Sequence, residues 1–258
     1  MTGTELRHAQ GTPCWVSLLT HDLGAAERFY GALLGWTFTP GPEDLGPYVR
    51  ALLGGLPVAG LGVMPPGAER PADWITYFAA DDADEAAQRV REHGGTVALG
   101  PLDSDSAGRL VVAADLDGAV FGVWQGRDHP GFRRQREPGA VAWSELSTPA
   151  ATGAARFYAG TFGSAAVETG RAQVERFEDH VVLKVGGHTV AGIRQAPATA
   201  ERPRWRVFFA VTDADDTAAR AVALGGRVES APADSPYGRI ALLRDTEDGP
   251  FAVVRLPD

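Results

Sequence analysis

The chain contains two similar halves, and this internal repeat constrains its fold more than any other feature. Trp15 recurs as Trp143 and the pair Phe29-Tyr30 recurs as Phe157-Tyr158, each 128 positions later. Three later landmarks recur 131 positions on: Trp74 as Trp205, Gly94-Gly95 as Gly225-Gly226, and Asp117-Gly118 as Asp248-Gly249. A duplication followed by a small loop insertion produces such offsets, so the sequence predicts two copies of one structural unit.

Each copy alternates between strand-like and helix-like patterns in the same order. Residues 14–20 predict a strand, Asp22 is a candidate N-cap, and a helix is expected from about Gly24 to Leu34, ended by Gly35. Three short β-like runs follow, separated by Pro- and Gly-rich turns. A second series then begins, with expected elements at 73–80 (strand), 82–93 (helix), 96–99, 109–114 and 119–125 (strands). Each copy is therefore predicted to contain two βαβββ units, an α+β fold.

The predicted domains are residues 12–126 and 140–257, and helices of the second are expected near 151–162 and 213–224. Residues 127–139 lie between them and are rich in Pro, Gly and Arg, so they are expected to form a linker outside both cores. The arginines of this linker could alternatively bind an anion; they are Arg127, Arg133, Arg134 and Arg136.

Composition and charge exclude several function classes. The formal net charge of −9 argues against nonspecific nucleic-acid binding, which needs concentrated positive charge. No apolar run approaches the roughly 20 residues that span a bilayer, and the N-terminus lacks a signal-peptide pattern, so a cytoplasmic protein without membrane partners is expected. Cys14 is the only cysteine, which excludes an intrachain disulfide and a cysteine-based zinc cluster.

These motifs resemble the vicinal oxygen chelate superfamily, which includes glyoxalase I, bleomycin-resistance proteins and extradiol dioxygenases. The resemblance covers almost the whole chain and is carried by segments that occur in order in both copies. They are residues 20–36, 81–95 with 212–226, and 115–124 with 245–254. It implies a tandem two-domain member in which each pair of βαβββ units curves mixed sheets into a cup.

Members that use a metal bind it with His, Glu or Gln side chains from the first and last strands of each unit, because a divalent cation needs converging lone-pair donors. Counting along the motifs places one position at Trp15 and Trp143. A second falls at Ile75 and Arg206, or one residue earlier at Trp74 and Trp205. The last-strand position falls at Gly122 and at Val253 or Ala252, and the remaining one within 58–63 and 190–195. None of these residues offers a suitable donor set, so both cups are expected to be metal-free, without a cofactor.

The six histidines do not restore a metal site, since none has a counterpart in the other copy. Four are expected in the N-terminal tail, a helix-start turn, a helix end and the linker. His180 and His188 are expected on a β-hairpin of the second copy.

A cup without metal leaves a concave apolar cavity, a common form of small-molecule site. Strand alternation places Trp15 with Ser17, and Trp143 with Glu145, on equivalent faces, and indole rings suit flat aromatic ligands. Further candidates for substrate binding are Tyr48, Trp74, Tyr77, Trp205, Phe209 and Tyr237. The alternative is that these aromatic residues form an ordinary core.

Glu145 is the candidate catalytic residue, because a partly desolvated carboxylate beside Trp143 could act as a general acid or base. The alternative is a structural ion pair with an arginine such as Arg206 or Arg194. Arg206, and Arg194 with it, are candidates for ligand binding; a guanidinium at this place could hold a carboxylate or phenolate. Since the first copy has Ser17 where the second has Glu145, the two cups are expected to differ chemically.

Three functions remain open from the sequence. The first is metal-independent binding of a hydrophobic or aromatic, natural-product-like small molecule. The second is a metal-free tailoring enzyme using acid–base chemistry on a polyketide-like or carbonyl-rich substrate. The third is a metal-dependent glyoxalase or dioxygenase. The expected partner is a small molecule in each case, and the chain is expected to be a monomer or homodimer.

Overall fold

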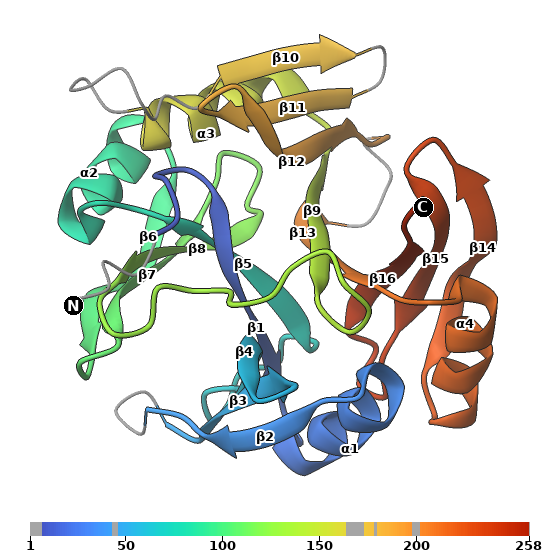
Figure 1. The fold of residues 1–258 in the computed structure, drawn as a ribbon. Coiled ribbons are helices and arrows are strands. Elements are labelled where there is room, and N and C mark those ends of the chain that lie inside the picture. Colours follow the sequence, from blue (N-terminus) through green and yellow to red (C-terminus); the bar gives the residue numbers. More distant parts are fainter. Residues whose placement is uncertain (1–6, 43–45, 164–172, 178–179, 198–201, 258) are drawn as a thin grey trace, which may run out of the picture. The chain divides into compact units, whose positions relative to one another are not determined.

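The computed structural model describes the chain except residues 1–6, 43–45, 164–172, 178–179, 198–201 and 258. The first copy contains β1 (Pro13–Thr20), α1 (Leu23–Leu34), β2 (Thr37–Pro40), β3 (Tyr48–Leu53), β4 (Leu56–Val63), β5 (Asp73–Ala79), α2 (Ala83–Glu92), β6 (Thr96–Ser104), β7 (Gly108–Ala114) and β8 (Val120–Gly126). The second contains β9 (Val141–Thr148), α3 (Ala151–Phe162), β10 (Gln173–Phe177), β11 (His180–Val185), β12 (His188–Gln195), β13 (Arg204–Ala210), α4 (Ala214–Ala223), β14 (Arg227–Ser235), β15 (Gly238–Arg244) and β16 (Pro250–Arg255). The four predicted βαβββ modules are confirmed (Figure 1).

The helix ends follow from local chemistry. The Asp22 carboxylate accepts a hydrogen bond from the Ala25 amide at the start of α1, and Gly35 ends the helix with a φ of 75°, which favours glycine. Asp82 caps α2 in the same way. Ala150 stands at the start of α3 and has no capping side chain. There the Gln195 side-chain oxygen accepts from the Ala151 amide instead (3.1 Å).

Each copy forms one eight-stranded mixed sheet, with orders β2-β3-β4-β1-β5-β8-β7-β6 and β10-β11-β12-β9-β13-β16-β15-β14. Within each module the first strand pairs in parallel with the last. Ser17 lies opposite Gly60 in the first copy, and Glu145 lies opposite Gly192 in the second. Because the registers match, the two copies can be compared residue by residue.

The chain also divides into two compact units that group modules from different copies. Unit 1 comprises residues 1–15, 76–131 and 144–205, and unit 2 comprises residues 16–75, 132–143 and 206–258. Unit 1 therefore contains α2 and α3, and unit 2 contains α1 and α4. The sheets follow the duplicated copies, whereas compact packing links modules that are far apart in the sequence.

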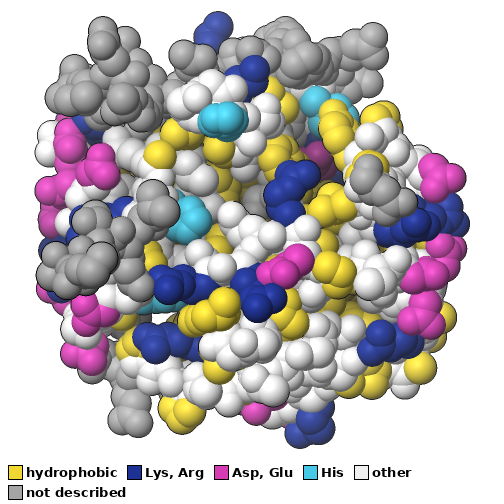
Figure 2. Space-filling view, in the orientation of Figure 1, with side chains coloured by type: hydrophobic (Ala, Val, Ile, Leu, Met, Phe, Trp, Pro, Cys, Tyr) yellow, Lys and Arg dark blue, Asp and Glu magenta, His cyan; other side chains and the backbone are white. Residues whose placement is uncertain are grey.

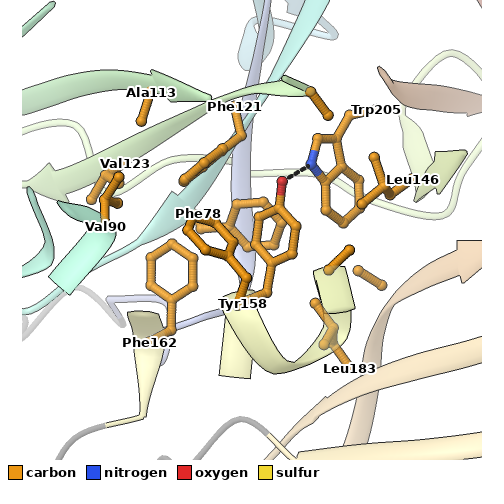
Figure 3. Packing of buried hydrophobic residues seen from close by; sticks show 14 of the residues in the cluster. Phe78, Val90, Ala113, Phe121, Val123, Leu146, Tyr158, Phe162, Leu183 and Trp205 are labelled. Atoms are coloured by element: carbon orange, nitrogen blue, oxygen red, sulfur yellow. Dashed lines mark hydrogen bonds between the residues drawn. The ribbon is translucent and has the colours of Figure 1, made fainter. Parts of the chain in front are cut away.

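The core of unit 1 is an aromatic cluster around Tyr158 (Figure 3). The Trp205 indole nitrogen donates to the Tyr158 hydroxyl (2.8 Å), which donates to the Asp115 carboxylate (3.0 Å). Phe78 and Phe121 pack against the same tyrosine ring. Burial raises the pKa of Asp115 and raises the pKa of Tyr158 well above its ordinary value.

Unit 2 contains an equivalent core. The Trp74 indole nitrogen donates to the Tyr30 hydroxyl (3.0 Å), which donates to the Asp245 carboxylate (2.9 Å). Phe209 and Phe251 pack around Tyr30, as Phe78 and Phe121 do around Tyr158. In both units a tyrosine of one copy thus meets an aspartate of the other.

The prediction that residues 127–139 lie outside both cores is wrong for residues 130–132. Pro130 and Gly131 are buried, and Phe132 is only 6% exposed. A Cβ at Gly131 would come within 2.3 Å of the Cys14 carbonyl oxygen, so the glycine permits close backbone approach. The surrounding Pro, Gly and Arg residues conceal this short buried segment in the sequence pattern.

Charges of both signs are interspersed with hydrophobic side chains on the face shown in Figure 2. This face is not the concentrated positive surface that phosphate backbones require. Among the residues that the structure describes, none of the helices has the length and apolar character needed to cross a bilayer.

Candidate functional site

Strand pairing identifies the residues at the expected metal-ligand positions. Trp74 and Trp205 point into the cores, which places Ile75 and Arg206 on the opposite face of β5 and β13. Tyr77 pairs with Gly122, and Phe208 pairs with Ala252. The last-strand position of the second copy is therefore Ala252 rather than Val253.

The expected 131-residue offset is wrong for the loop before the last strand. Asp115 accepts from the backbone amides two and four residues later, Asp117 and Ala119. Asp245 accepts from Glu247 and Gly249 in the same way. Residues that make the same hydrogen bonds in the two loops are therefore 130 positions apart. The shared Asp-Gly pairs, which are 131 apart, do not occupy equivalent structural positions.

The side chains at these positions do not fit a divalent metal. Indole, alkyl and glycine groups have no donor for a divalent cation, and the guanidinium of Arg206 repels one. Among the described residues, no three His, Cys, Asp or Glu side chains are placed to hold a metal ion elsewhere. In the second copy these positions instead carry an aromatic ring, that of Trp143, and a positive group, that of Arg206.

The second copy carries an apolar cluster on the face of β13–β16 turned away from α4. Phe208 and Ala210 of β13 and Ala252 and Val254 of β16 form its buried part together with Ala142. Trp143, Ile240, Leu242 and Leu256 pack against it and are only partly buried. We call this group of residues the apolar face.

Arg206 lies on the same side of β13 as Phe208, and it is mostly buried, with 12% of its side chain exposed. Its Nη2 donates to Glu229 (2.6 Å), which also forms an ion pair with the buried Arg244 (Nε to carboxylate oxygen 2.8 Å). Arg206 Nη1 is buried and has no partner among the described residues. Two arginines thus share one carboxylate beside the apolar face, and a buried donor without a partner costs stability.

Glu145 lies on β9 on the same side as Trp143, because the two residues are two positions apart on one strand. Its carboxylate accepts from Arg194 Nε (3.1 Å), while its other oxygen lies 3.7 Å from His180 Nε2. Leu146, Val181 and Ile193 point the opposite way, into the core around α3. We call Glu145, His180 and Arg194 the polar cluster; it faces away from α3.

The polar cluster bears on the two alternatives for Glu145. The ion pair with Arg194 is the structural alternative, and it is present. The side chain of Glu145 is 17% exposed, whereas those of His180 and Arg194 are 37% and 41% exposed. The catalytic assignment of Glu145 stays a prediction, now with an imidazole beside the carboxylate.

The first copy has different residues at the equivalent places. Ser17 takes the place of Glu145, and its hydroxyl lies 3.0 Å from the Tyr48 hydroxyl. Tyr48 takes the place of His180, opposite Gly62 on β4, as His180 lies opposite Arg194 on β12. A Cβ at Gly60 would lie 1.6 Å from the Tyr48 hydroxyl oxygen, so the tyrosine side chain covers this glycine.

The face of β5–β8 in the first copy is filled by aromatic side chains and by the linker. Tyr77 covers Gly122, where a Cβ would lie 2.0 Å from its ring. The Trp15 ring meets the His129 ring edge-on at 4.4 Å, and Trp124 donates to the His129 carbonyl (2.8 Å). Trp15 and Tyr77 are thus occupied by contacts within the chain.

The structure separates the remaining candidates. Trp74, Trp205 and Phe209 are core residues that are 2% exposed or less, so the core alternative holds for them. Tyr237 is 66% exposed in the turn between β14 and β15. Trp143, Glu145, Arg194 and Arg206 remain on strand faces turned away from the helices.

His180, Glu229 and Arg244 were not predicted as site residues from the sequence. For His180 a signal existed: it lies 132 positions after Tyr48, the same offset that relates Gly60 to Gly192. Glu229 pairs with both Arg206 and Arg244, and these residues come together only because β13, β16, β15 and β14 lie side by side in the sheet. No local sequence motif indicates Glu229 or Arg244.

Known proteins are similar to this chain in sequence and in fold. A glyoxalase-like domain profile matches residues 143–254, and a profile of the bleomycin resistance protein-like N-terminal domain matches residues 13–49. "Putative glyoxylase CFP32" of Mycobacterium tuberculosis is 39% identical over 253 residues, with 96% of each chain covered. The anthracycline biosynthesis protein DnrV of Streptomyces peucetius is 40% identical over 265 residues, covering 97% of this chain and 95% of DnrV.

Solved structures agree at the level of the fold. The Mn(II)-bound glyoxalase from Novosphingobium aromaticivorans superposes with a TM-score of 0.63 at 18% identity, covering 97% of this chain and 84% of the other. A catechol 2,3-dioxygenase superposes with a TM-score of 0.60 at 14% identity, covering 97% and 90%. The chain belongs to the vicinal oxygen chelate superfamily, as a member with two tandem glyoxalase-like domains.

Proposed function

We propose that this protein binds a flat, hydrophobic small molecule of natural-product type without a metal, and that the second copy provides the site. One observation carries the proposal. At the positions where relatives use metal donors, the second copy has Trp143, Arg206 and Ala252, set beside a partly open apolar face.

The physical properties of this face suit an aromatic ligand. A partly buried indole offers a large, rigid surface on which a fused ring stacks. Removing apolar area of both partners from water supplies the main driving force, at about 25 cal/mol per Å². Polar groups at the edge, such as Arg206, give orientation rather than affinity.

The relatives support the same ligand class. DnrV and DauV are named as anthracycline biosynthesis proteins. Anthracyclines contain a flat fused-ring skeleton that carries carbonyl and hydroxyl oxygens. A ligand or substrate of this kind would combine the aromatic surface and the hydrogen-bonding oxygens that Trp143 and Arg206 are suited to meet.

The test is a titration with emodin, a hydroxylated anthraquinone, in the presence of EDTA. Binding is monitored by the quenching of tryptophan fluorescence and by calorimetry. We expect saturable binding, and we expect Trp143→Ala to weaken it by about tenfold or more, with Trp143→Phe retaining most of the affinity. Binding that appears only after addition of Mn, Fe, Ni or Zn would contradict the proposal and support the metal-dependent alternative.

A metal-free tailoring enzyme is the second candidate function, and the polar cluster favours it. A carboxylate beside an imidazole is a common arrangement for moving protons. A Glu145→Gln variant that binds emodin normally but loses turnover of a carbonyl-rich polycyclic substrate would support this function. Unchanged turnover would remove Glu145 from the mechanism.

A further inference from the structure

The apolar face ends at a row that contains two arginines. Phe208 of β13 and Leu242 of β15 both pair with Ala252 of β16. Arg206 lies two positions before Phe208 and shares its side of β13. Arg244 lies two positions after Leu242 and shares its side of β15. Because β13 runs parallel and β15 antiparallel to β16, both arginines lie at the same end of the apolar face.

Arg206 is incompletely matched at this end of the face. One oxygen of Glu229 accepts from Nη2 of Arg206 (2.6 Å), and the other forms the ion pair with Arg244 (2.8 Å). One negative charge is thus divided between two guanidinium groups. Nη1 of Arg206 is buried and has no hydrogen-bond partner among the described residues. A buried donor that lacks an acceptor is costly, so an anionic acceptor that reaches Nη1 removes an existing penalty as well as forming a new bond.

A carboxylate is the ligand group that best supplies what this guanidinium lacks. Its oxygens only accept hydrogen bonds, and hydrogen bonds between ions are about twice as strong as those between neutral groups. A carbonyl or hydroxyl oxygen would satisfy the donor but bring no negative charge. A phosphate dianion would bring more charge into apolar surroundings than one free nitrogen can offset.

We propose that the ligand is an aromatic acid whose rings lie on the apolar face against Trp143 and whose carboxylate meets Nη1 of Arg206. This inference rests on the proposed function, because it names the polar group that the ligand carries at that same site. Arg206 and Phe208 stand about 7 Å apart along their strand, a separation that one fused-ring acid spans. Because solvent does not reach Nη1, the carboxylate must displace a partly buried side chain of the face. All these residues belong to unit 2, within 132–143 and 206–258.

The test compares rhein, an anthraquinone carboxylic acid, with aloe-emodin, in which a hydroxymethyl group replaces the carboxylate. Both are titrated near neutral pH with EDTA and measured by calorimetry. Wild type should bind rhein about tenfold or more tightly than aloe-emodin. Arg206→Gln keeps a hydrogen-bond donor without the charge and should reduce this affinity ratio to about one. Arg220→Gln removes an equal charge from α4, from which the apolar face is turned away, and should keep the wild-type ratio.

Glu229→Gln tests the same contact with the opposite sign, and it serves where Arg206→Gln does not fold. It removes the shared carboxylate from Arg206, so rhein should be preferred more strongly than by wild type. A wild-type ratio near one would overturn the inference. So would a ratio that survives in Arg206→Gln, or one that Glu229→Gln does not raise. In these cases Trp143-dependent binding of aloe-emodin would leave the proposed function intact, whereas absence of binding by both compounds would overturn both.

Discussion

The first modules of the two copies share a backbone and differ in what they present on one strand face. In the first copy Ser17 and Tyr48 meet through their hydroxyls, and the tyrosine covers Gly60. In the second copy the same places hold Glu145, His180 and Arg194. The two modules therefore keep the same backbone, whereas this strand face is charged in the second copy and covered by Tyr48 in the first.

The cores show the opposite behaviour. Each compact unit contains the same chain of donors, from tryptophan to tyrosine to aspartate: Trp205, Tyr158 and Asp115 in unit 1, and Trp74, Tyr30 and Asp245 in unit 2. These residues are buried and serve packing in both units. The two cores are therefore equivalent, whereas the outer strand faces of the two copies carry different residues.

The largest expected effect tests the symmetry of the cores. Trp205→Ala and Trp74→Ala should each lower the free energy of unfolding by about 3–5 kcal/mol, because each removes a buried indole and a donor to a buried hydroxyl. Urea unfolding followed by circular dichroism measures the loss. If only one variant were strongly destabilised, the equivalence of the two cores would fail.

A smaller effect is expected where the copies differ at the last strand. Gly122→Ala places a Cβ 2.0 Å from the Tyr77 ring and should cost about 1–3 kcal/mol by overpacking. Gly153→Ala in α3 is the matched control, since its Cβ meets nothing closer than 3.9 Å, and it should stabilise by roughly 0.5–1 kcal/mol. Equal thermal stability of Gly122→Ala and wild type would show that Tyr77 does not cover this glycine.

The smallest effect concerns the pH dependence of the cores. Burial raises the pKa of Asp115 above its ordinary value of 3.8, so the folded chain binds this proton more tightly than the unfolded chain does. The contribution of Asp115 to stability is then greatest below that value and falls as pH rises through the raised pKa. The stability advantage of wild type over Asp115→Asn should shrink from about pH 4 toward neutrality.

Two surface aspartates have pKa shifts of the opposite sign, and their contributions to stability should therefore change with pH in the opposite direction. Arg109 lowers the pKa of Asp84, and Arg239 lowers that of Asp215, so their contributions are present above the ordinary value and are lost as pH falls through the lowered pKa. Unfolding free energies of Asp115→Asn and Asp84→Asn, each compared with wild type across pH, separate the two signs. An advantage over Asp115→Asn that grows with pH would contradict the burial argument.

Much of the fold could be predicted because its signals are local. Asp22 and Gly35 mark the ends of α1, and strand alternation gives the faces of β1 and β9. The pairing of Tyr158 with Asp115 could not be predicted, because it joins residues of different copies that have no shared motif. The burial of Phe132 was also hidden, since the residues around it have the composition of a solvated linker.

The candidate site was predicted in part for the same reason. Local counting along the strands found Trp143, Glu145, Arg194 and Arg206. The same counting could not decide between a binding role and a core role for Trp74 and Trp205, because that depends on which face of the strand meets a tyrosine from elsewhere in the chain. Glu229 pairs with Arg206 and with Arg244 only once the sheet is assembled, so neither residue could be predicted from its sequence neighbours.

The central claim is that the second copy binds an aromatic ligand without a metal. The most direct test compares emodin affinity of wild type, Trp143→Ala and Trp15→Ala, all with EDTA and measured by calorimetry. We predict one site per chain, a loss of about tenfold or more in Trp143→Ala, and a clearly smaller loss in Trp15→Ala, whose ring contacts His129. Equal losses in the two variants, or binding that EDTA abolishes, would contradict the account.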